Sequence, residues 1–259
     1  TSFSFLTHDF KLSKNLTYSS INFVKIGGKI VGEKRPVFII AEVGSNHRGK
    51  IENALRAIEI AAGAGADAVK FQHLTSTKIA ADIRVYDEWN GRKSWDTFSE
   101  FYKPSELPYE WTDKLVRHAK KHDIMFLSTP FDYEAVDVLD KANVAAFKVA
   151  SYEMTADSLL SYIAKKRKPM IVSTGMAYLS EVESAVRTIE AAKNREYVLL
   201  QCTSNYPADP ADANLAAMGT MATAFAALVG YSDHTPGIEV PLAAVALGGA
   251  VISVIGLVH

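Results

Sequence analysis

PVFIIAEVGSNHRGKIENALRAIEIAAGAGADAVKFQ (36–72) is the stretch of sequence that decides the fold. It begins with a short apolar run, VFIIAEV (37–43), and ends with a second one, AVKFQ (68–72). Between them, IENALRAIEIAAGAG (51–65) repeats apolar residues at three- and four-residue spacing and ends at glycine, as an amphipathic helix does. Two nearly continuous apolar runs joined by such a helix indicate parallel strands that are buried on both faces.

The same rhythm continues along the chain. Helical patterns at 109–122 and 184–193 separate later strands, and Ser180 to Glu183 reads as a capping box that opens the second of these helices. The expected strands are VFIIAEV (37–43), AVKFQ (68–72), IMFLS (124–128), AAFKVAS (145–151), PMIVST (169–174), YVLLQCT (197–203), LVGYS (228–232) and AVISVIG (250–256). Eight such units predict an α/β fold of the TIM (β/α)8 barrel type, with a doubly wound open sheet as the alternative.

The remaining segments complete the expected organisation. Residues 22–32 predict a β-hairpin that turns at Gly27-Gly28, after a polar extension. We therefore expect an N-terminal extension and hairpin over 1–35 and a TIM-barrel catalytic domain over 36–259. Residues 73–107 form a long insertion after the second strand, and loops of that length are usually lids or interface pieces.

Composition limits the classes of function. The chain has 259 residues, of which 48% are hydrophobic and 22% charged, with a formal net charge of −1. A nearly neutral chain gives no reason to expect nucleic acid or an acidic membrane surface as partner. The single cysteine fits a reducing compartment, and no apolar run approaches the roughly 20 residues of a membrane span. These features predict a cytoplasmic protein.

Two lysines interrupt apolar strands near their carboxyl ends, where the active site of this fold is built. Lys70 and Lys148 lie in AVKFQ and AAFKVAS, where a lysine is costly unless it is paired or holds a ligand. Each could instead extend from the strand end to solvent. Hydroxyl groups gather at the same level, and together with two lysines they suggest a small, highly charged anion. These hydroxyls belong to Thr129, Ser151, Ser173, Ser204 and Ser232, although Ser and Thr are also ordinary helix caps.

Carboxylates and further polar groups lie near the same strand ends. Glu42 and Glu153 could take protons, bind sugar hydroxyls or help to hold a metal, and ion pairing with Lys70 or Lys148 is the alternative. Gln72 shares a strand face with Lys70 and is a plausible polar contact. Tyr206 follows the sixth strand and could close over a substrate.

Histidine and cysteine residues add further candidates. His234 ends the seventh strand, where a metal or a carbonyl group could sit, and Asp233 would orient it or cap the next helix. His47 lies in the first loop, and a lone histidine is more often structural than a ligand. Cys202 is most simply a buried core thiol.

The motifs along the chain resemble, in order, those of the N-acetylneuraminate (sialic acid) synthase family, which includes legionaminic, pseudaminic and spore-coat polysaccharide synthases. The stretches that carry the resemblance are IIAEVGSNHRG, GADAVKFQ, FLSTPFD, FKVASYE, PMIVSTGMA, QCTSNYP and VGYSDHTPG, between about Phe23 and Gly249. The resemblance implies a TIM barrel preceded by a small hairpin. It also implies condensation of phosphoenolpyruvate with the open-chain aldehyde of an N-acylated hexosamine, which gives a nine-carbon 2-keto acid and phosphate.

The resemblance also assigns roles to residues of this sequence. Glu42, Gln72 and Tyr206 would face the sugar. Glu153 would act on the positive charge that develops at the enol carbon and on the water that attacks there. His234 would be one of two histidine ligands of a divalent metal, Mn²⁺ or Mg²⁺, that polarises the aldehyde oxygen. Phosphoenolpyruvate would be held by Lys70, Thr129, Lys148, Ser151, Ser173, Ser204 and Ser232.

The sequence departs from the family pattern in its last strand. Ser253 to Leu257 stands where Glu-Lys-His-Phe-Thr is expected, so that Ile255 occupies the position of the second histidine ligand. His259 lies four residues further on, roughly 13 Å along an extended strand, so direct replacement of the missing ligand by His259 is the least favoured explanation. Family members continue into a C-terminal antifreeze-like domain that reaches the partner's active site in a homodimer. The resemblance therefore implies a homodimer here, and we expect no antifreeze-like domain within residues 1–259.

Three hypotheses of function follow. The chain is a synthase of this family, or it is a Schiff-base aldolase on the same fold with Lys70 or Lys148 as the nucleophile. The third hypothesis is a non-catalytic protein that retains the anion pocket and has lost the metal, which the isoleucine at position 255 suggests. The choice of amino sugar depends on loops that the sequence does not place.

Overall fold

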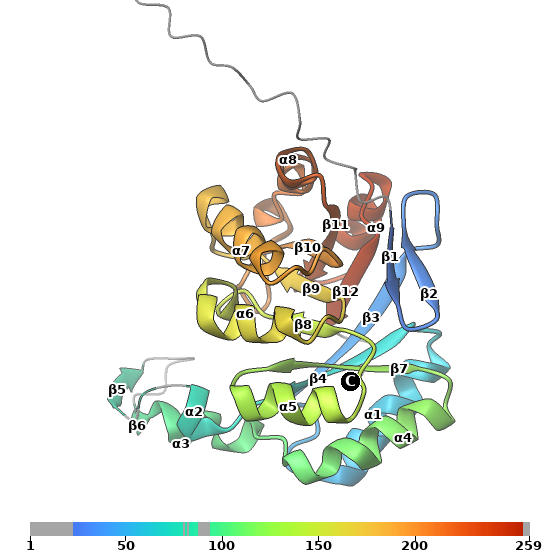
Figure 1. The fold of residues 1–259 in the computed structure, drawn as a ribbon. Helices are drawn as coiled ribbons and strands as arrows, with labels where there is room; N and C mark the ends of the chain where they lie inside the picture. The colour runs from blue at the N-terminus through green and yellow to red at the C-terminus, as the bar shows by residue number, and fades with distance from the viewer. Residues whose placement is uncertain (1–22, 80, 82, 88–93, 256–259) are drawn as a thin grey trace, which may run out of the picture.

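The computed structural model describes residues 23–79, 81, 83–87 and 94–255. Eight parallel strands close into a barrel in chain order, and β12 pairs with β3 to complete the ring (Figure 1). This closure confirms the predicted TIM barrel and excludes the open sheet. The barrel strands are β3 (Phe38–Gly44), β4 (Ala68–His73), β7 (Met125–Pro130), β8 (Phe147–Val149), β9 (Met170–Ser173), β10 (Tyr197–Cys202), β11 (Leu228–Asp233) and β12 (Val251–Ile255).

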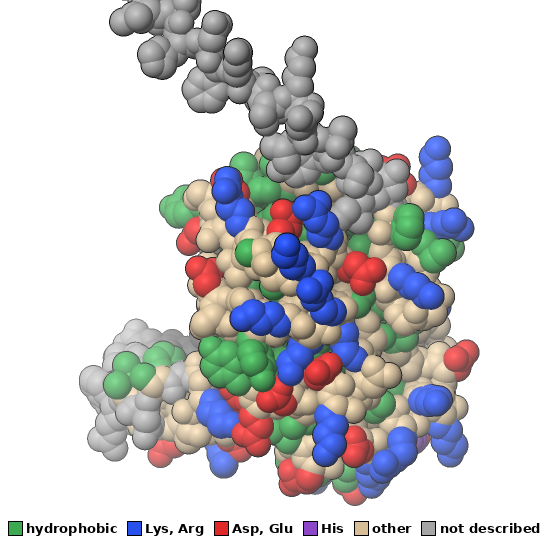
Figure 2. All heavy atoms as spheres, in the orientation of Figure 1, with side chains coloured by type: hydrophobic (Ala, Val, Ile, Leu, Met, Phe, Trp, Pro, Cys, Tyr) green, Lys and Arg blue, Asp and Glu red, His purple; other side chains and the backbone are tan. Residues whose placement is uncertain are grey.

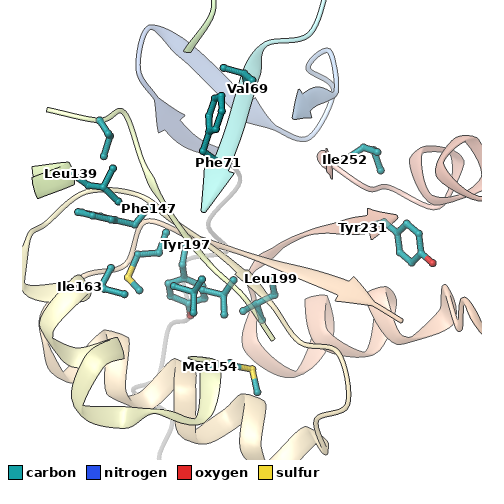
Figure 3. Packing of buried hydrophobic residues seen from close by; sticks show 14 of the residues in the cluster. Val69, Phe71, Leu139, Phe147, Met154, Ile163, Tyr197, Leu199, Tyr231 and Ile252 are labelled. Carbon is teal, nitrogen blue, oxygen red and sulfur yellow. The ribbon is translucent and has the colours of Figure 1, made fainter. Parts of the chain in front are cut away.

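Helices surround the barrel because each strand turns one apolar face outward. The outer core includes Phe71, Phe147, Tyr197 and Leu199, which pack beneath the helices (Figure 3). Burial of each such side chain stabilises the folded state by roughly 1.5–3 kcal/mol. The helices are α1 (Ile51–Gly63), α4 (Thr112–Lys121), α5 (Tyr133–Lys141), α6 (Asp157–Lys165), α7 (Leu179–Ala191), α8 (Ala216–Phe225) and α9 (Glu239–Ala246).

The predicted capping box at Ser180 is wrong. The helix α7 begins at Leu179, and Tyr178 is its N-cap, in an extended conformation. The side chain of Glu181 accepts a hydrogen bond of 2.7 Å from the backbone N–H of Tyr178, so the reciprocal glutamate is Glu181. Glu183 instead pairs with Arg187 one turn later. Glu181 and Glu183 lie two residues apart, so a glutamate three residues after the N-cap is available from either Tyr178 or Ser180, and the register that starts at Tyr178 forms.

The predicted N-terminal hairpin is present and closes one end of the barrel. Its strands β1 (Phe23–Ile26) and β2 (Lys29–Gly32) are antiparallel, and Gly27 takes the positive φ of +57° that the turn requires. Val24, Ile26 and Val31 pack with apolar residues of the barrel interior. Because these residues fill the end where the strands begin, the carboxyl ends of the strands form the accessible mouth.

The insertion after β4 folds into short elements of its own. It contains α2 (Ser76–Ile79), the antiparallel strands β5 (Arg84–Asp87) and β6 (Ser94–Thr97), and α3 (Phe98–Tyr102). The 3-10 turns Lys103–Ser105 and Tyr109–Trp111 lead back to α4. The β5–β6 hairpin projects away from the barrel (Figure 1). Positions 80, 82 and 88–93 of the insertion, the extension before position 23 and the last four residues lie outside the described part of the chain.

Charged side chains of both signs are mixed over the face of the molecule drawn in Figure 2. On this face, the distribution agrees with the nearly neutral composition. Among the described residues, every helix is too short or too polar to cross a lipid bilayer.

Candidate active site

Polar residues line the mouth of the barrel, directly above the apolar residues that fill its interior. Ile40, Leu127, Ile171 and Leu200 belong to the interior cluster, and side chains two residues further along a strand face the same way. This alternation places a polar ring above the apolar plug. The ring consists of Glu42, Lys70, Thr129, Lys148, Ser173, Cys202, Ser232 and Ser253.

Lys70 is almost completely buried and is paired across the sheet. Its Nζ lies 2.8 Å from Oε2 of Glu42 and 3.3 Å from Oγ1 of Thr129. The other carboxylate oxygen of Glu42 accepts a hydrogen bond from the hydroxyl of Ser253. The alternative of ion pairing is therefore the observed state for Glu42.

Lys148 is also buried, with 3% of its surface exposed, but it has no carboxylate within ion-pair distance among the described residues. Its Nζ donates to the hydroxyl of Ser173 at 2.6 Å and to the carbonyl oxygen of Val149 at 2.9 Å. Burial and the nearby ammonium of Lys70 lower the pKa of Lys148 to about 8. Of the two ammonium groups, that of Lys70 has a closely paired carboxylate and that of Lys148 has none among the described residues, which favours an anion in the mouth.

Hydroxyl groups gather around Gly175, which follows β9. Its backbone N–H donates to Oγ of Ser151 at 3.0 Å. A Cβ at this glycine would lie 2.5 Å from Oγ of Ser204 and 2.9 Å from Oγ of Ser151, so both hydroxyls face the same small space. Burial raises the pKa of the Cys202 thiol, and the nearby hydroxyls of Ser232 and Ser151 oppose that rise. Cys202 is a free, buried thiol, as predicted, and its side chain follows the inward parity of Leu200 and so also faces the polar ring.

Glu153 lies in the 3-10 turn Glu153–Thr155 that follows β8. Its Oε2 is buried and has no hydrogen-bond partner in the structure. Burial raises the pKa of Glu153 to about 7, and the positive charges of Lys148 and Lys70 oppose that rise. A carboxyl group with such a pKa can both accept and donate a proton near neutral pH.

His234 and Tyr206 stand together at the rim. Their rings stack with centroids 3.8 Å apart and an interplanar angle of 27°. Nδ1 of His234 lies 2.7 Å from the carbonyl oxygen of Thr203, and because a carbonyl only accepts, Nδ1 carries the proton. The lone pair of Nε2 is then available, and burial lowers the pKa of His234. The side chain of Tyr206 is more than half exposed, which agrees with a residue that closes over a substrate.

The expected metal site is incomplete. Ile255 lies on β12 opposite Glu42, two residues beyond Ser253, and its side chain has no donor atom. Two other described imidazoles lie at or just after the ends of barrel strands, but His47 is fully buried against Trp111, and both ring nitrogens of His73 are bonded to the hydroxyls of Ser128 and Thr112. His234 is therefore the imidazole available at the mouth. The described residues therefore do not fit a metal site with two histidine ligands.

Two roles suggested for Asp233 are wrong. Its Oδ1 accepts from the backbone N–H and the hydroxyl of Thr235, at 3.1 and 2.7 Å. It therefore holds the turn after β11. The helix α9 begins only at Glu239, beyond the reach of an aspartate cap at 233.

Two residues of the site escaped the sequence reasoning. Ser253, which bonds Glu42, has the inward parity of Val251, so alternation along the last strand could have found it. Gly175 gave no signal by itself, because its importance depends on two serines from other strands.

Gln72 is half-buried at the end of β4 with its amide oxygen toward Gly44, on the inward face shared with Lys70.

The fold and the site together define a (β/α)8 barrel whose mouth presents two buried lysines and a set of hydroxyls. The sequence model of the NeuB family matches residues 57–253, and the chain belongs to that family. The resemblance to the sialic acid synthase family is thereby confirmed.

Similar proteins carry related names. The chain is 42% identical over 222 residues to the N,N'-diacetyllegionaminic acid synthase of Campylobacter jejuni, covering 84% of this chain and 66% of the relative. It is 41% identical over 231 residues to the spore coat polysaccharide biosynthesis protein SpsE of Bacillus subtilis, covering 88% and 61%. The chain thus spans less than two thirds of the length of these relatives.

A solved structure confirms the fold. The N-acetylneuraminic acid synthetase of Leptospira borgpetersenii, in complex with citrate, superposes with a TM-score of 0.82 at 35% identity. The match covers 92% of this chain and 79% of that chain.

Proposed function

We propose that this chain condenses phosphoenolpyruvate with the open-chain aldehyde of an N-acylated hexosamine, giving a nine-carbon 2-keto acid and phosphate. The observation that carries the proposal is the excess of buried positive charge at the mouth. Lys148 donates hydrogen bonds only to neutral groups, and Lys70 shares Glu42 with Ser253. A small ligand with a carboxylate and a phosphate supplies the missing negative charge.

Phosphoenolpyruvate has two anionic ends, and the donors around the mouth can receive both. Lys70 and Thr129 form one side, and Lys148 with Ser173 forms the next side along the barrel. The remaining donors proposed for this substrate are Ser151, Ser204 and Ser232, around Gly175 and Cys202. Glu42, Gln72 and Tyr206 are proposed to contact the amino sugar.

The reaction needs one carbon–carbon bond and the removal of phosphate. The methylene carbon of phosphoenolpyruvate attacks the aldehyde carbon, whose oxygen takes up a proton, and positive charge develops at the enol carbon that bears the phosphate. Water adds to that carbon, and the carbon–oxygen bond to phosphate then breaks to leave the ketone. Glu153 is suited to take the proton of the water, because its pKa near 7 leaves it partly ionised at neutral pH.

A second candidate function rests on Lys148. A lysine whose pKa is lowered to about 8 is partly neutral at physiological pH and can attack a keto group to form a Schiff base. A lysine aldolase would use pyruvate and would release no phosphate. The third hypothesis, a binding protein without turnover, is favoured by the absence of a metal ligand at Ile255.

The experiment offers the purified chain phosphoenolpyruvate with a panel of sugars: N-acetylmannosamine, its 6-phosphate and deoxy-diacetamido hexoses. The proposal predicts phosphate release with at least one sugar, and none with Lys148→Met. Borohydride trapping of a pyruvate adduct on Lys148, without phosphate release, would establish the aldolase instead. Binding of phosphoenolpyruvate without any turnover would support the third hypothesis, a binding protein.

A further inference from the structure

Two helices on the outside of the barrel bring three metal-ligating side chains together. His118 and His122 are separated by one turn at the end of α4, and Glu59 faces them from α1. Their donor atoms all lie within 4.8 Å of one another, and each residue is half-buried. Among the residues that the structure describes, these three form the one group of histidine, cysteine or carboxylate side chains this compact.

The spacing agrees with coordination by a single ion. Nε2 of His118 lies 3.2 Å from Oε1 of Glu59. Two ligands that bind one tetrahedral zinc ion at about 2.0–2.1 Å are separated by about 3.3 Å. The ring of His122 lies 4.6 Å from the ring of His118, centroid to centroid, so a change of side-chain torsion brings its nitrogen into range.

The surroundings support a ligand role for the carboxylate. Arg56 donates to Oε2 of Glu59 at 2.9 Å, which orients the carboxylate and leaves Oε1 toward the histidines. Hydrogen bonds of this kind to the outer oxygen of a ligand are typical of metal sites. The end of α4 also favours a cation, because the carbonyl groups of a helix point out of its C-terminus.

The cluster is separate from the mouth of the barrel. The barrel strands run toward the mouth and the helices run back, so His118 and His122, at the C-terminal end of α4, lie toward the opposite end. Figure 1 shows α1 and α4 side by side along the outside of the barrel. An ion here would link two neighbouring helices and would not contact the substrates.

We propose that Glu59, His118 and His122 bind a divalent transition-metal ion, with water as a fourth ligand. Two imidazoles and a carboxylate favour Zn²⁺, Cu²⁺ or Ni²⁺ over Mg²⁺ or Ca²⁺. Each histidine binds through a nitrogen that carries no proton and keeps its proton on the other ring nitrogen. The ion stabilises the packing of α1 against α4.

A calorimetric titration with Zn²⁺ tests the proposal. We use the His234→Ala background so that the imidazole at the mouth does not contribute. The proposal predicts one site, with affinity reduced at least about tenfold by His118→Ala or His122→Ala and also reduced by Glu59→Gln. Lys120→Ala, an exposed neighbour on the same helix, is the matched control and should bind as the background does.

Thermal unfolding gives a second readout. Saturating Zn²⁺ should raise the midpoint of the background protein by about 5 °C and should leave that of the double variant His118→Ala/His122→Ala unchanged. With chelator present, equal midpoints for the two proteins show that the double variant folds. Equal Zn²⁺ affinity and stoichiometry with and without these two histidines would overturn the proposal.

Discussion

Lys70 and Glu42 form an ion pair of 2.8 Å across the neighbouring strands β4 and β3, with side chains only 5% and 12% exposed. In water such a pair contributes little to stability, but at this depth each charge depends on the other. Ser253 holds the second oxygen of Glu42 from β12. The pair therefore ties three consecutive strands together at the point where the last strand closes the barrel.

Removing one partner of this pair should be costlier than removing both. We predict that Lys70→Met lowers the free energy of unfolding by about 3 kcal/mol at pH 7, because Glu42 is left as a buried charge. Adding Glu42→Gln should restore most of the loss, since the amide still accepts from Ser253. Urea denaturation of the two single variants and the double variant measures this. Additive effects of the two substitutions would show that the pair is not coupled.

Glu153 should make stability depend on pH. Burial raises its pKa from the ordinary 4.5 to about 7, so the folded state keeps a proton that the unfolded state loses. Stability is fully present below pH 4.5, falls as the pH rises toward 7, and is lower by about 3 kcal/mol above that. We predict that Glu153→Gln flattens the unfolding free energy across this window. If the unfolding free energy of the wild type has the same slope against pH as that of the variant between pH 5 and 7, Glu153 is not the cause.

Gly175 should be required for the anion pocket. A methyl group there would lie 2.5 Å from Oγ of Ser204 and 2.9 Å from Oγ of Ser151, so both hydroxyls must move. We predict that Gly175→Ala weakens phosphoenolpyruvate binding about tenfold or more, by calorimetry. Gly63→Ala is the control, because its added methyl meets open space at the end of α1. Unchanged affinity in Gly175→Ala would place the ligand elsewhere.

A second imidazole should strengthen metal binding at the mouth. Ile255 lies opposite Glu42 on β12, on the strand face of Ser253. We predict that Ile255→His binds Mn²⁺ at least about tenfold more tightly than the wild type, with His234 as the other ligand. Ile255→Gln controls for the change in polarity, and His234→Ala should cancel the gain. A gain that survives His234→Ala would show that Ile255 does not face this imidazole.

Periodicity was enough to predict the barrel and the inward direction of Lys70 and Lys148, because strand alternation and βα repetition are properties of short stretches. Details set by competing hydrogen bonds were not predictable in this way, as the turn around Asp233 and the start of α7 show. Contacts between distant segments were also beyond reach. Ser253 meets Glu42 across 211 positions, and Glu59 meets His118 only because α1 packs on α4.

We have proposed that the charged mouth of the barrel joins phosphoenolpyruvate to an amino sugar. The most direct measurement follows released phosphate and the 2-keto acid together, by colorimetry and mass spectrometry, with the sugar panel and with and without Mn²⁺. We expect equal amounts of both products, only when both substrates are present, and neither product with Lys148→Met. Formation of the keto acid from pyruvate, or no phosphate release with any sugar, would contradict it.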